Sequence, residues 1–153
     1  MAANTEEAKM APIRISTTLA AGSNRRIIAR AGGHVIQMDV RKERGGDDAG
    51  PTPPECLAMA LGGCVMNLTR IIARERRIRL DDISMVISGD IDPSRAFGLG
   101  GNVRAGFSEL SIAVEMVPEL SEGDRELFQR ELSRRCPLCD TIGNPTPLNI
   151  AFK

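Results

Sequence analysis

The chain has 153 residues, enough for one domain with its own core, and its 20 basic and 20 acidic residues leave no formal net charge at pH 7. A neutral chain lacks the long-range positive field that recruits nucleic acid or an anionic membrane. With 4 Phe and neither Tyr nor Trp, it also lacks the aromatic platforms on which single-stranded nucleic acid stacks. We therefore expect neither a nucleic-acid nor a membrane partner.

The first residues, MAANTEEAKM, contain two acids and no apolar run, so they do not resemble a secretory signal. No stretch approaches the ~18 consecutive apolar residues of a membrane span. Under these conditions the 4 cysteines are expected to be reduced, reactive or metal-bound, because structural disulfides belong to exported proteins. We predict a flexible tail over residues 1–11, a single domain over 12–153 and a cytoplasmic location.

The N-terminal part of the domain predicts three short strands in a meander. They cover residues 12–20, 25–30 and 34–40, and the AGG at 31–33 suits a tight hairpin between the last two. The segment 41–54 is rich in Gly and Pro and is expected to be a loop.

A long helix is predicted to begin at Thr52. The spacing of Thr52 and Glu55 is that of a capping box, with Pro53 at the first helical position, where proline is tolerated. An apolar stripe then recurs at helical spacing, formed by Leu57, Leu61, Cys64 or Val65, Leu68 and Ile72. A helix of about 24 residues is long against the mean of ~11, which indicates a central, buried element.

The C-terminal part predicts two strands, 82–91 and 108–117, joined by a glycine-rich loop at 92–106. A second helix is expected from Ser121, with Asp124 as its capping partner, to a stop at Pro137. Residues 147–153 alternate polar and apolar side chains and predict a closing strand. The order βββ-α-ββ-α-β is that of an α+β fold with segregated helices.

Cys64 is the first candidate for chemistry. It lies inside the long helix on the apolar stripe, where a cysteine can simply be a small core hydrophobe. Gly62 and Gly63 precede it directly, and each glycine within a helix costs about 1 kcal/mol relative to alanine. The pair makes sense where a second backbone or a substrate must come close to Cys64, which favours a site.

The motif CPLC places Cys136 and Cys139 three residues apart and allows several interpretations. A thioredoxin-type centre should follow a strand and open a long helix, whereas this motif follows a helix. A zinc site needs two more ligands, and no second C-x-x-C or H-x-x-x-H motif supplies them. Pro137 can also begin a new turn with Cys136 at its cap, which would lower the thiol pKa. A cysteine that merely ends its helix is the remaining alternative.

Two segments resemble the cysteine motifs of the OsmC/Ohr family: GPTPPECLAMALGGC at 50–64 and RRCPLCDTIGNPTPLNI at 134–150. The likeness spans about 34–152. It is strongest to the branch with the pattern H…D…GG…GP ahead of the first cysteine, found here as His34, Asp39, Gly45-Gly46 and Gly50-Pro51.

The resemblance implies an intertwined homodimer with a thiol-dependent peroxidase site at the subunit interface. Cys64 would attack an organic hydroperoxide, Cys136 would resolve the sulfenic acid as a disulfide, and an external dithiol would reduce it, with no metal or bound cofactor. The resemblance also implies an arginine from the N-terminal hairpin, Arg25 or Arg26, and a glutamate near the start of the long helix, Glu55. Cys139 stands where the family usually has a small polar residue and is a candidate second resolving cysteine.

Two alternatives to the peroxidase are a non-enzymatic ligand-binding or redox-sensing dimer of the same fold, and a zinc-bound structural protein using Cys136 and Cys139. An arginine contact matters for the peroxidase because only about 3% of a thiol with pKa near 8.5 is thiolate at pH 7. Reaching one half requires a shift of roughly 1.5 units, about 2 kcal/mol, which a buried arginine can supply.

Overall fold

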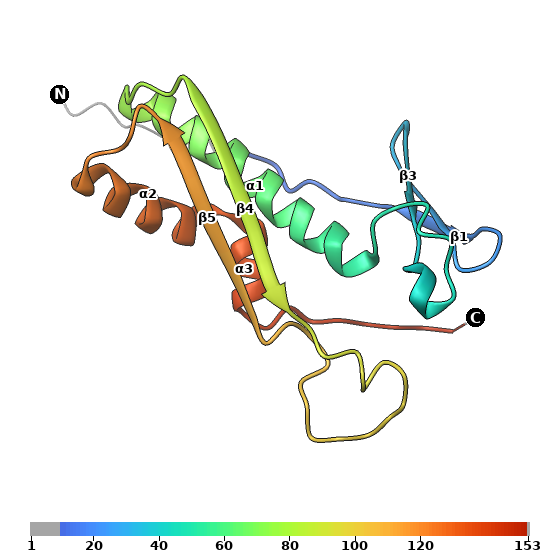
Figure 1. Ribbon diagram of the computed structural model, residues 1–153. Helices are drawn as coiled ribbons and strands as arrows, with labels where there is room; N and C mark the ends of the chain where they lie inside the picture. The colour runs from blue at the N-terminus through green and yellow to red at the C-terminus, as the bar shows by residue number, and fades with distance from the viewer. Residues whose placement is uncertain (1–9, 153) are drawn as a thin grey trace. The chain divides into compact units, whose positions relative to one another are not determined.

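The computed structural model describes residues 10–152. Most of the tail predicted at 1–11 lies outside the described residues, as does residue 153. The chain forms two compact units, Met1–Pro53 and Pro54–Lys153. The whole is an α+β structure with the predicted strands before and after one long helix (Figure 1).

The first unit contains a three-stranded antiparallel meander, as predicted. It consists of β1 (Thr18–Ala21), β2 (Ile27–Ala31) and β3 (His34–Met38), hydrogen-bonded in the order β1-β2-β3. Ala31 pairs with His34 across a turn formed by Gly32 and Gly33, and Gly32 has φ +57°. The AGG segment is therefore the tight hairpin expected from the sequence.

The first strand is shorter than the predicted span of 12–20. In β1, Thr18 pairs with Arg30, so residues before it run past the end of the β2–β3 hairpin. A strand needs a neighbour to satisfy its backbone groups, and within the described residues none lies beside 12–17. The alternation of apolar residues alone does not reveal where that neighbour ends.

The loop that follows β3 is organised around the side chain of Asp39, which is fully buried. Its carboxylate accepts hydrogen bonds from the backbone N–H groups of Val40, Asp47 and Ala49 at 2.8, 3.1 and 3.0 Å. The N–H of Ala49 contributes most, and together these bonds lower the pKa of Asp39 despite its burial. The loop includes a short 3₁₀ helix, η1 (Lys42–Arg44).

The long helix α1 (Pro53–Arg76) has the predicted 24 residues. Four members of the predicted stripe are buried, namely Leu61, Val65, Leu68 and Ile72, whereas Leu57 is 43% exposed. Leu57 thus falls outside the buried stripe, in the first turns of the helix. The remaining stripe forms the core of the second unit together with Phe128 and Cys136.

A two-stranded antiparallel sheet and a second helix complete this core (Figure 1). The strands are β4 (Asp82–Asp90) and β5 (Glu109–Val117), and the helix is α2 (Glu122–Arg135). Ser121 caps α2 as predicted, because its hydroxyl accepts the N–H of Asp124 at 3.2 Å. Side chains of β4 and β5, including Met85, Ile87 and Ile112, pack against the buried cluster.

By length and composition α1 is apolar enough to cross a membrane, contrary to the expectation that no stretch comes close. The same properties belong to the core helix of a soluble protein. Seven residues of α1 are buried against the rest of the chain. We therefore assign α1 as the core helix of the second unit.

The predicted closing strand at 147–153 is wrong for its described residues. After a third helix, α3 (Pro137–Gly143), the chain through residue 152 forms neither strand nor helix. Its alternating apolar side chains are exposed: Leu148 by 85%, Ile150 by 71% and Phe152 by 97%. The alternation is typical of a strand, but no strand edge in the described part of the chain pairs with it.

Candidate active site

Cys64 lies in the middle of α1, partly buried, with a glycine pair directly before it. A Cβ atom at Gly62 would lie 2.5 Å from Cδ1 of Ile87, so a β4 side chain fills the space that alanine would need. The close approach expected at Gly62 therefore exists, but it is made by a side chain and not by a backbone or a substrate. Gly63 is exposed, and beyond its own stretch of α1 no atom of the described residues lies within 4 Å of where a Cβ would be.

Cys136 occupies the junction between α2 and α3 and is only 1% exposed. Its backbone N–H donates to the carbonyl of Leu132 at 3.0 Å, which closes α2. Its sulfur accepts the backbone N–H of Cys139 at 3.4 Å, which makes Cys136 the N-cap of α3. The prediction that Pro137 begins a new turn capped by Cys136 is thus confirmed.

The sulfur atoms of Cys64 and Cys136 are 3.5 Å apart, although 72 residues separate them in the sequence. Cys139 packs against the same core cluster, which brings three of the four cysteines into one group. This distance permits a hydrogen bond between the thiols. Disulfide formation would require only that the two sulfurs approach by about 1.5 Å.

The surroundings of this pair favour a thiolate on Cys136. Burial works against a charge there, but the hydrogen bonds donated to its sulfur by the backbone of Cys139 and by the thiols of Cys139 and Cys64 outweigh it, so its pKa is lowered. Burial raises the pKa of Cys64, and contact with Cys136 raises it further. Of the two thiols, that of Cys136 therefore loses its proton more readily than that of Cys64.

Cys139 has the least acidic thiol of the three. Burial, followed by contact with Cys136 and Cys64, raises its pKa to about 12. Its side chain also lines a cavity of about 750 Å³ in the second unit. The cavity is walled largely by apolar residues of α1, β5 and α2, among them Val65, Ile112, Met116, Phe128 and Leu132.

Arg135, which precedes Cys136, fastens the end of α2 to the end of α1. Its guanidinium donates to both carboxylate oxygens of Glu75 at 2.7 and 2.9 Å and to Glu131 at 3.3 Å. These carboxylates raise the pKa of Arg135, so the charge is permanent. Arg135 thus pairs with the two carboxylates and not with the Cys136 sulfur, and through Glu75 it holds Cys136 beside α1.

Glu75 was not foreseen from the sequence. It stands 60 residues from Arg135, among the arginines of the last turns of α1, and nothing in its local pattern indicates a partner that far away. Only the packing of α2 along α1 creates the contact.

Of the predicted residues Glu55, Arg25 and Arg26, the first lies on α1 and the other two lie between β1 and β2. Glu55 precedes Cys64 by nine residues of α1, which places it about 13 Å away along the helix axis and on the opposite side of the helix. Arg25 is exposed in the turn between β1 and β2. Arg26 forms an ion pair of 3.0 Å with Asp47, and its Nε atom is buried with no partner among the described residues.

Within residues 10–152, no group of three or more His, Cys, Asp or Glu side chains is placed to hold a metal ion. The zinc alternative for Cys136 and Cys139 therefore lacks a complete ligand set in the described part of the chain. Cys56 is partly buried in the first turn of α1 and does not belong to the core cluster.

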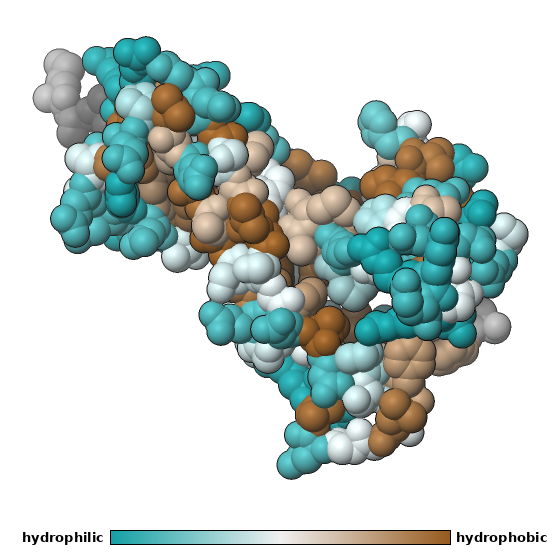
Figure 2. Space-filling model, viewed as in Figure 1, coloured by the Kyte–Doolittle hydropathy of each residue, from teal (hydrophilic) through white to brown (hydrophobic). Residues whose placement is uncertain are grey.

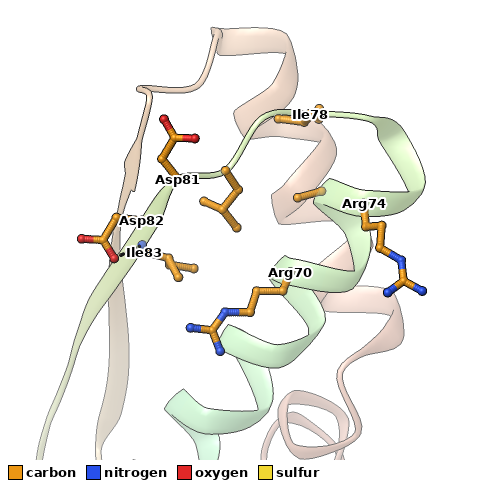
Figure 3. A pocket seen from close by; sticks show the side chains of 8 residues that line it. Arg70, Arg74, Ile78, Asp81, Asp82 and Ile83 are labelled. Carbon is orange, nitrogen blue, oxygen red and sulfur yellow. Dashed lines mark hydrogen bonds between the residues drawn. The ribbon is translucent and has the colours of Figure 1, made fainter.

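A second hollow, of about 320 Å³, lies where α1 turns into β4 (Figure 3). Arg70 and Arg74 line it from the helix, and Asp81 and Asp82 from the strand side. The side chain of Arg74 points away from the two carboxylates (Figure 3), and Asp81 is paired with Arg79 at 2.6 Å. Because its charged groups do not converge, this hollow is a poor candidate for a site.

The fold and the contacting thiols define an α+β protein in which a partly buried cysteine on a long central helix contacts a buried cysteine between α2 and α3. Residues 45–151 match the family model described as OsmC-like protein, and the chain belongs to that family. No curated protein sequence matches the chain.

Solved structures with the same fold include three from bacteria. An OsmC-like protein from Mycoplasma pneumoniae has a TM-score of 0.73 and 20% identity, over 86% of this chain and 88% of that one. An organic hydroperoxide resistance protein from Legionella pneumophila has a TM-score of 0.63 and 19% identity, over 87% of this chain and 91% of that one. An organic hydroperoxide resistance protein from Elizabethkingia anophelis has a TM-score of 0.65 and 15% identity, over 86% of this chain and 89% of that one. At these identities the likeness establishes the fold.

Proposed function

We propose that this protein is a thiol-dependent peroxidase that reduces organic hydroperoxides, with Cys64 as the attacking and Cys136 as the resolving cysteine. The observation that carries the proposal is the 3.5 Å contact between their sulfur atoms. Membership in the OsmC-like family supports it, as does the fold shared with two organic hydroperoxide resistance proteins.

Accessibility supports the assignment of the two roles. Cys64 is partly exposed, whereas Cys136 is 1% exposed, so a peroxide from solution reaches the sulfur of Cys64 first. Cys136 then needs only to reach a sulfur that is already its neighbour. A buried resolving thiol is also protected from direct oxidation.

The contact between the two sulfurs gives Cys64 a route to its reactive form. When Cys136 is a thiolate, the proton of Cys64 passes to it as a peroxide binds; the pKa of Cys136 is lowered and that of Cys64 is raised. The Cys64 thiolate attacks the outer peroxide oxygen, so that an S–O bond forms, the O–O bond breaks and an alkoxide leaves. The alkoxide takes the proton back from Cys136 and becomes the alcohol. Cys64 is then a sulfenic acid and Cys136 a thiolate.

Resolution, the second step, starts from the Cys136 thiolate that the first step leaves. The Cys136 thiolate attacks the sulfur of Cys64, the S–S bond forms, and hydroxide leaves and is protonated to water. The net reaction converts one hydroperoxide and two thiols into an alcohol, water and a disulfide. An external dithiol restores the thiols, which suits a reducing compartment such as the cytoplasm.

An arginine close to Cys64 would lower the pKa of its thiol and speed the first step. Of the two candidates, Arg26 is better supported than Arg25, because its Nε is a buried donor with no partner among the described residues. Glu55 is the candidate glutamate that would orient this arginine. Its place on the far side of α1 means that it would act through the arginine and not on the sulfur directly.

A homodimer is proposed as the functional form, with the long helices packed against each other. A single chain exposes many large hydrophobic side chains, including Met59 and Ile71 on α1 and Val86 and Val114 on the β4–β5 sheet. Hydrophobic surface is visible over this sheet in Figure 2. Apolar area of this kind is typical of a surface covered by another subunit.

The proposal is tested by following cumene hydroperoxide consumption in the presence of dithiothreitol. Wild type should turn over, and Cys64→Ser should be inactive. In a separate reaction without dithiothreitol, Cys136→Ser should consume one equivalent and stop at a sulfenic acid that dimedone traps. Cys56→Ser is the matched control, since Cys56 lies on the same helix outside the cluster, and it should behave as wild type. Equal rates for wild type and Cys64→Ser would contradict the proposal.

A ligand-binding or redox-sensing dimer is the second candidate. It is favoured by the raised pKa of Cys64, which opposes rapid catalysis, and by the apolar cavity of about 750 Å³ beside Cys139. This function predicts that Cys64 is oxidised slowly and only once, with no turnover in the dithiothreitol assay.

A further inference from the structure

The third cysteine of the cluster is not used by the two-cysteine cycle. Cys139 lies three residues after Cys136, at the start of the helix that Cys136 caps. Its backbone N–H donates a hydrogen bond of 3.4 Å to the Cys136 sulfur, and its side chain packs against the same core cluster. The Cys136 sulfur thus lies 3.5 Å from the Cys64 sulfur and is also held by the backbone of Cys139.

We infer that Cys139 is a second resolving cysteine, which takes over the disulfide from Cys64 and forms a Cys136–Cys139 bond. The inference rests on the proposed function for the origin of the first disulfide. Within the cluster it needs no other residue, because Cys136 is the common partner in both bonds.

The exchange is balanced in atoms and electrons. The Cys139 thiolate attacks the Cys136 sulfur, the new S–S bond forms, and the bond between Cys136 and Cys64 breaks. Cys64 leaves as a thiolate and accepts the proton that Cys139 has lost. One disulfide is replaced by another, so no oxidant or reductant is consumed.

The charges of the cluster set the order of events. In the reduced protein, Cys139 is kept as a thiol by burial and then by its contacts with Cys136 and Cys64. Once these two residues form a disulfide neither can carry a charge, so that part of the opposition to a Cys139 thiolate disappears. Cys139 is thus a weaker nucleophile before the first disulfide has formed than after it.

The exchange has two consequences. Cys64 returns to the thiol state and can meet a second peroxide before any reductant arrives. The oxidised bond meanwhile includes Cys139, whose side chain lines the cavity bounded by α1, β5 and α2, whereas Cys64 does not line it.

Peptide mapping separates the two disulfides cleanly. Cleavage after Arg44, Arg70 and Arg135 yields peptide 45–70 with Cys56 and Cys64, and peptide 136–153 with Cys136 and Cys139. A Cys64–Cys136 bond therefore cross-links two peptides. A Cys136–Cys139 bond leaves peptide 136–153 on its own and lighter by two hydrogens.

The experiment oxidises the reduced full chain with one equivalent of either cumene hydroperoxide or diamide, followed by alkylation at timed intervals. In wild type and in the Cys56→Ser control, the cross-linked pair should appear first and then decay as the internally bridged peptide 136–153 grows. In Cys139→Ser the cross-link should persist. In a parallel reaction with excess hydroperoxide and no reductant, wild type should also consume up to twice as much hydroperoxide as Cys139→Ser, because its Cys64 is set free.

A cross-link that persists in wild type, or an internally bridged peptide that forms without a preceding cross-link, overturns the inference. The diamide arm makes the first disulfide without peroxide chemistry. If cumene hydroperoxide oxidises nothing while diamide gives the expected exchange, the peroxidase proposal fails and the exchange stands. If both oxidants give only the stable cross-link, the peroxidase proposal stands and the exchange fails.

Discussion

The guanidinium of Arg135 donates two hydrogen bonds, of 2.7 and 2.9 Å, to the carboxylate of Glu75 and so links the last turn of α2 to the last turn of α1. Cys136 is the next residue after Arg135, and its sulfur lies 3.5 Å from that of Cys64 on the same helix α1. A bidentate pair fixes orientation as well as distance. The contact between the cysteines therefore depends on a pair of charges that takes no part in the chemistry.

Replacing Arg135 by lysine tests this dependence. Lysine keeps the charge but loses the two-point contact with Glu75, so Cys136 should be positioned less well. We expect disulfide formation with Cys64 to slow by about tenfold, since small misplacements of reacting groups are costly, while the initial reaction of Cys64 with peroxide is unchanged. Rapid-quench peptide mapping separates the two steps.

Arg134→Lys is the matched control for that substitution. The Arg134 guanidinium contacts Glu131 at 3.4 Å, and its side chain is 72% exposed. This change should leave both steps as in wild type. A similar slowing of disulfide formation in both variants would indicate that general destabilisation, and not the loss of the Arg135–Glu75 ion pair, is responsible.

The acidity of Cys64 should respond to the removal of its neighbour. Burial is the main cause of its raised pKa, and contact with Cys136 adds to it. Cys136→Ser removes the competing thiolate, so the pKa of Cys64 should fall and its thiolate should appear at lower pH than in wild type. The rate of iodoacetamide alkylation against pH measures this, and an unchanged or higher midpoint in the variant would contradict the influence of Cys136 on the pKa of Cys64.

Two glycines provide a test of the proposed dimer. Gly63 in α1 and Gly123 in α2 are both helical, and neither has an atom within 4 Å of the position of a Cβ. In a lone chain, alanine at either position should stabilise its helix by up to about 1 kcal/mol. If the α1 helices of two subunits pack closely, Gly63→Ala should instead weaken the dimer, while Gly123→Ala remains stabilising.

Urea unfolding and sedimentation equilibrium of the two alanine variants distinguish these cases. Stabilisation by both alanines, with no change in the association constant, would place Gly63 outside any subunit contact.

Asp39 should make the stability of the first unit dependent on pH. Its pKa in the folded chain is lowered from 3.8 by hydrogen bonds from Ala49, Val40 and Asp47. A lowered pKa contributes stability that is present above the unfolded value and is lost as the pH falls through the folded value. We therefore expect Asp39→Asn to speed hydrogen exchange at the amides of Asp47 and Ala49 at neutral pH. This difference from wild type should shrink below pH 3.8. Equal exchange rates at pH 7 would contradict this role.

Much of this architecture could be predicted from local signals. The AGG hairpin, the 24 residues of α1 and the Ser121 cap each depend on residues within one or two turns of one another. The resemblance of two short motifs pointed to Cys64 and Cys136 as partners, and the cap at Cys136 was among the alternatives that Pro137 suggested.

The features that were not predicted depend on contacts between elements far apart in the sequence. Residues 12–17 and 147–152 alternate like strands, yet no partner edge lies beside them within the described residues. The contact of Ile87 with Gly62 and the ion pair of Arg135 with Glu75 form only when distant elements pack together. The protonation order of Cys64, Cys136 and Cys139 likewise requires their mutual contacts.

The most direct test of the central claim uses the double variant Cys56→Ser/Cys139→Ser, in which Cys64 and Cys136 are the only cysteines left. The reduced protein is mixed with one equivalent of cumene hydroperoxide, and free thiols, peroxide and peptides are measured together. The account predicts rapid loss of both thiols, consumption of one equivalent of peroxide and a single cross-link between peptides 45–70 and 136–153. Two thiols that survive unchanged beside intact peroxide would contradict it.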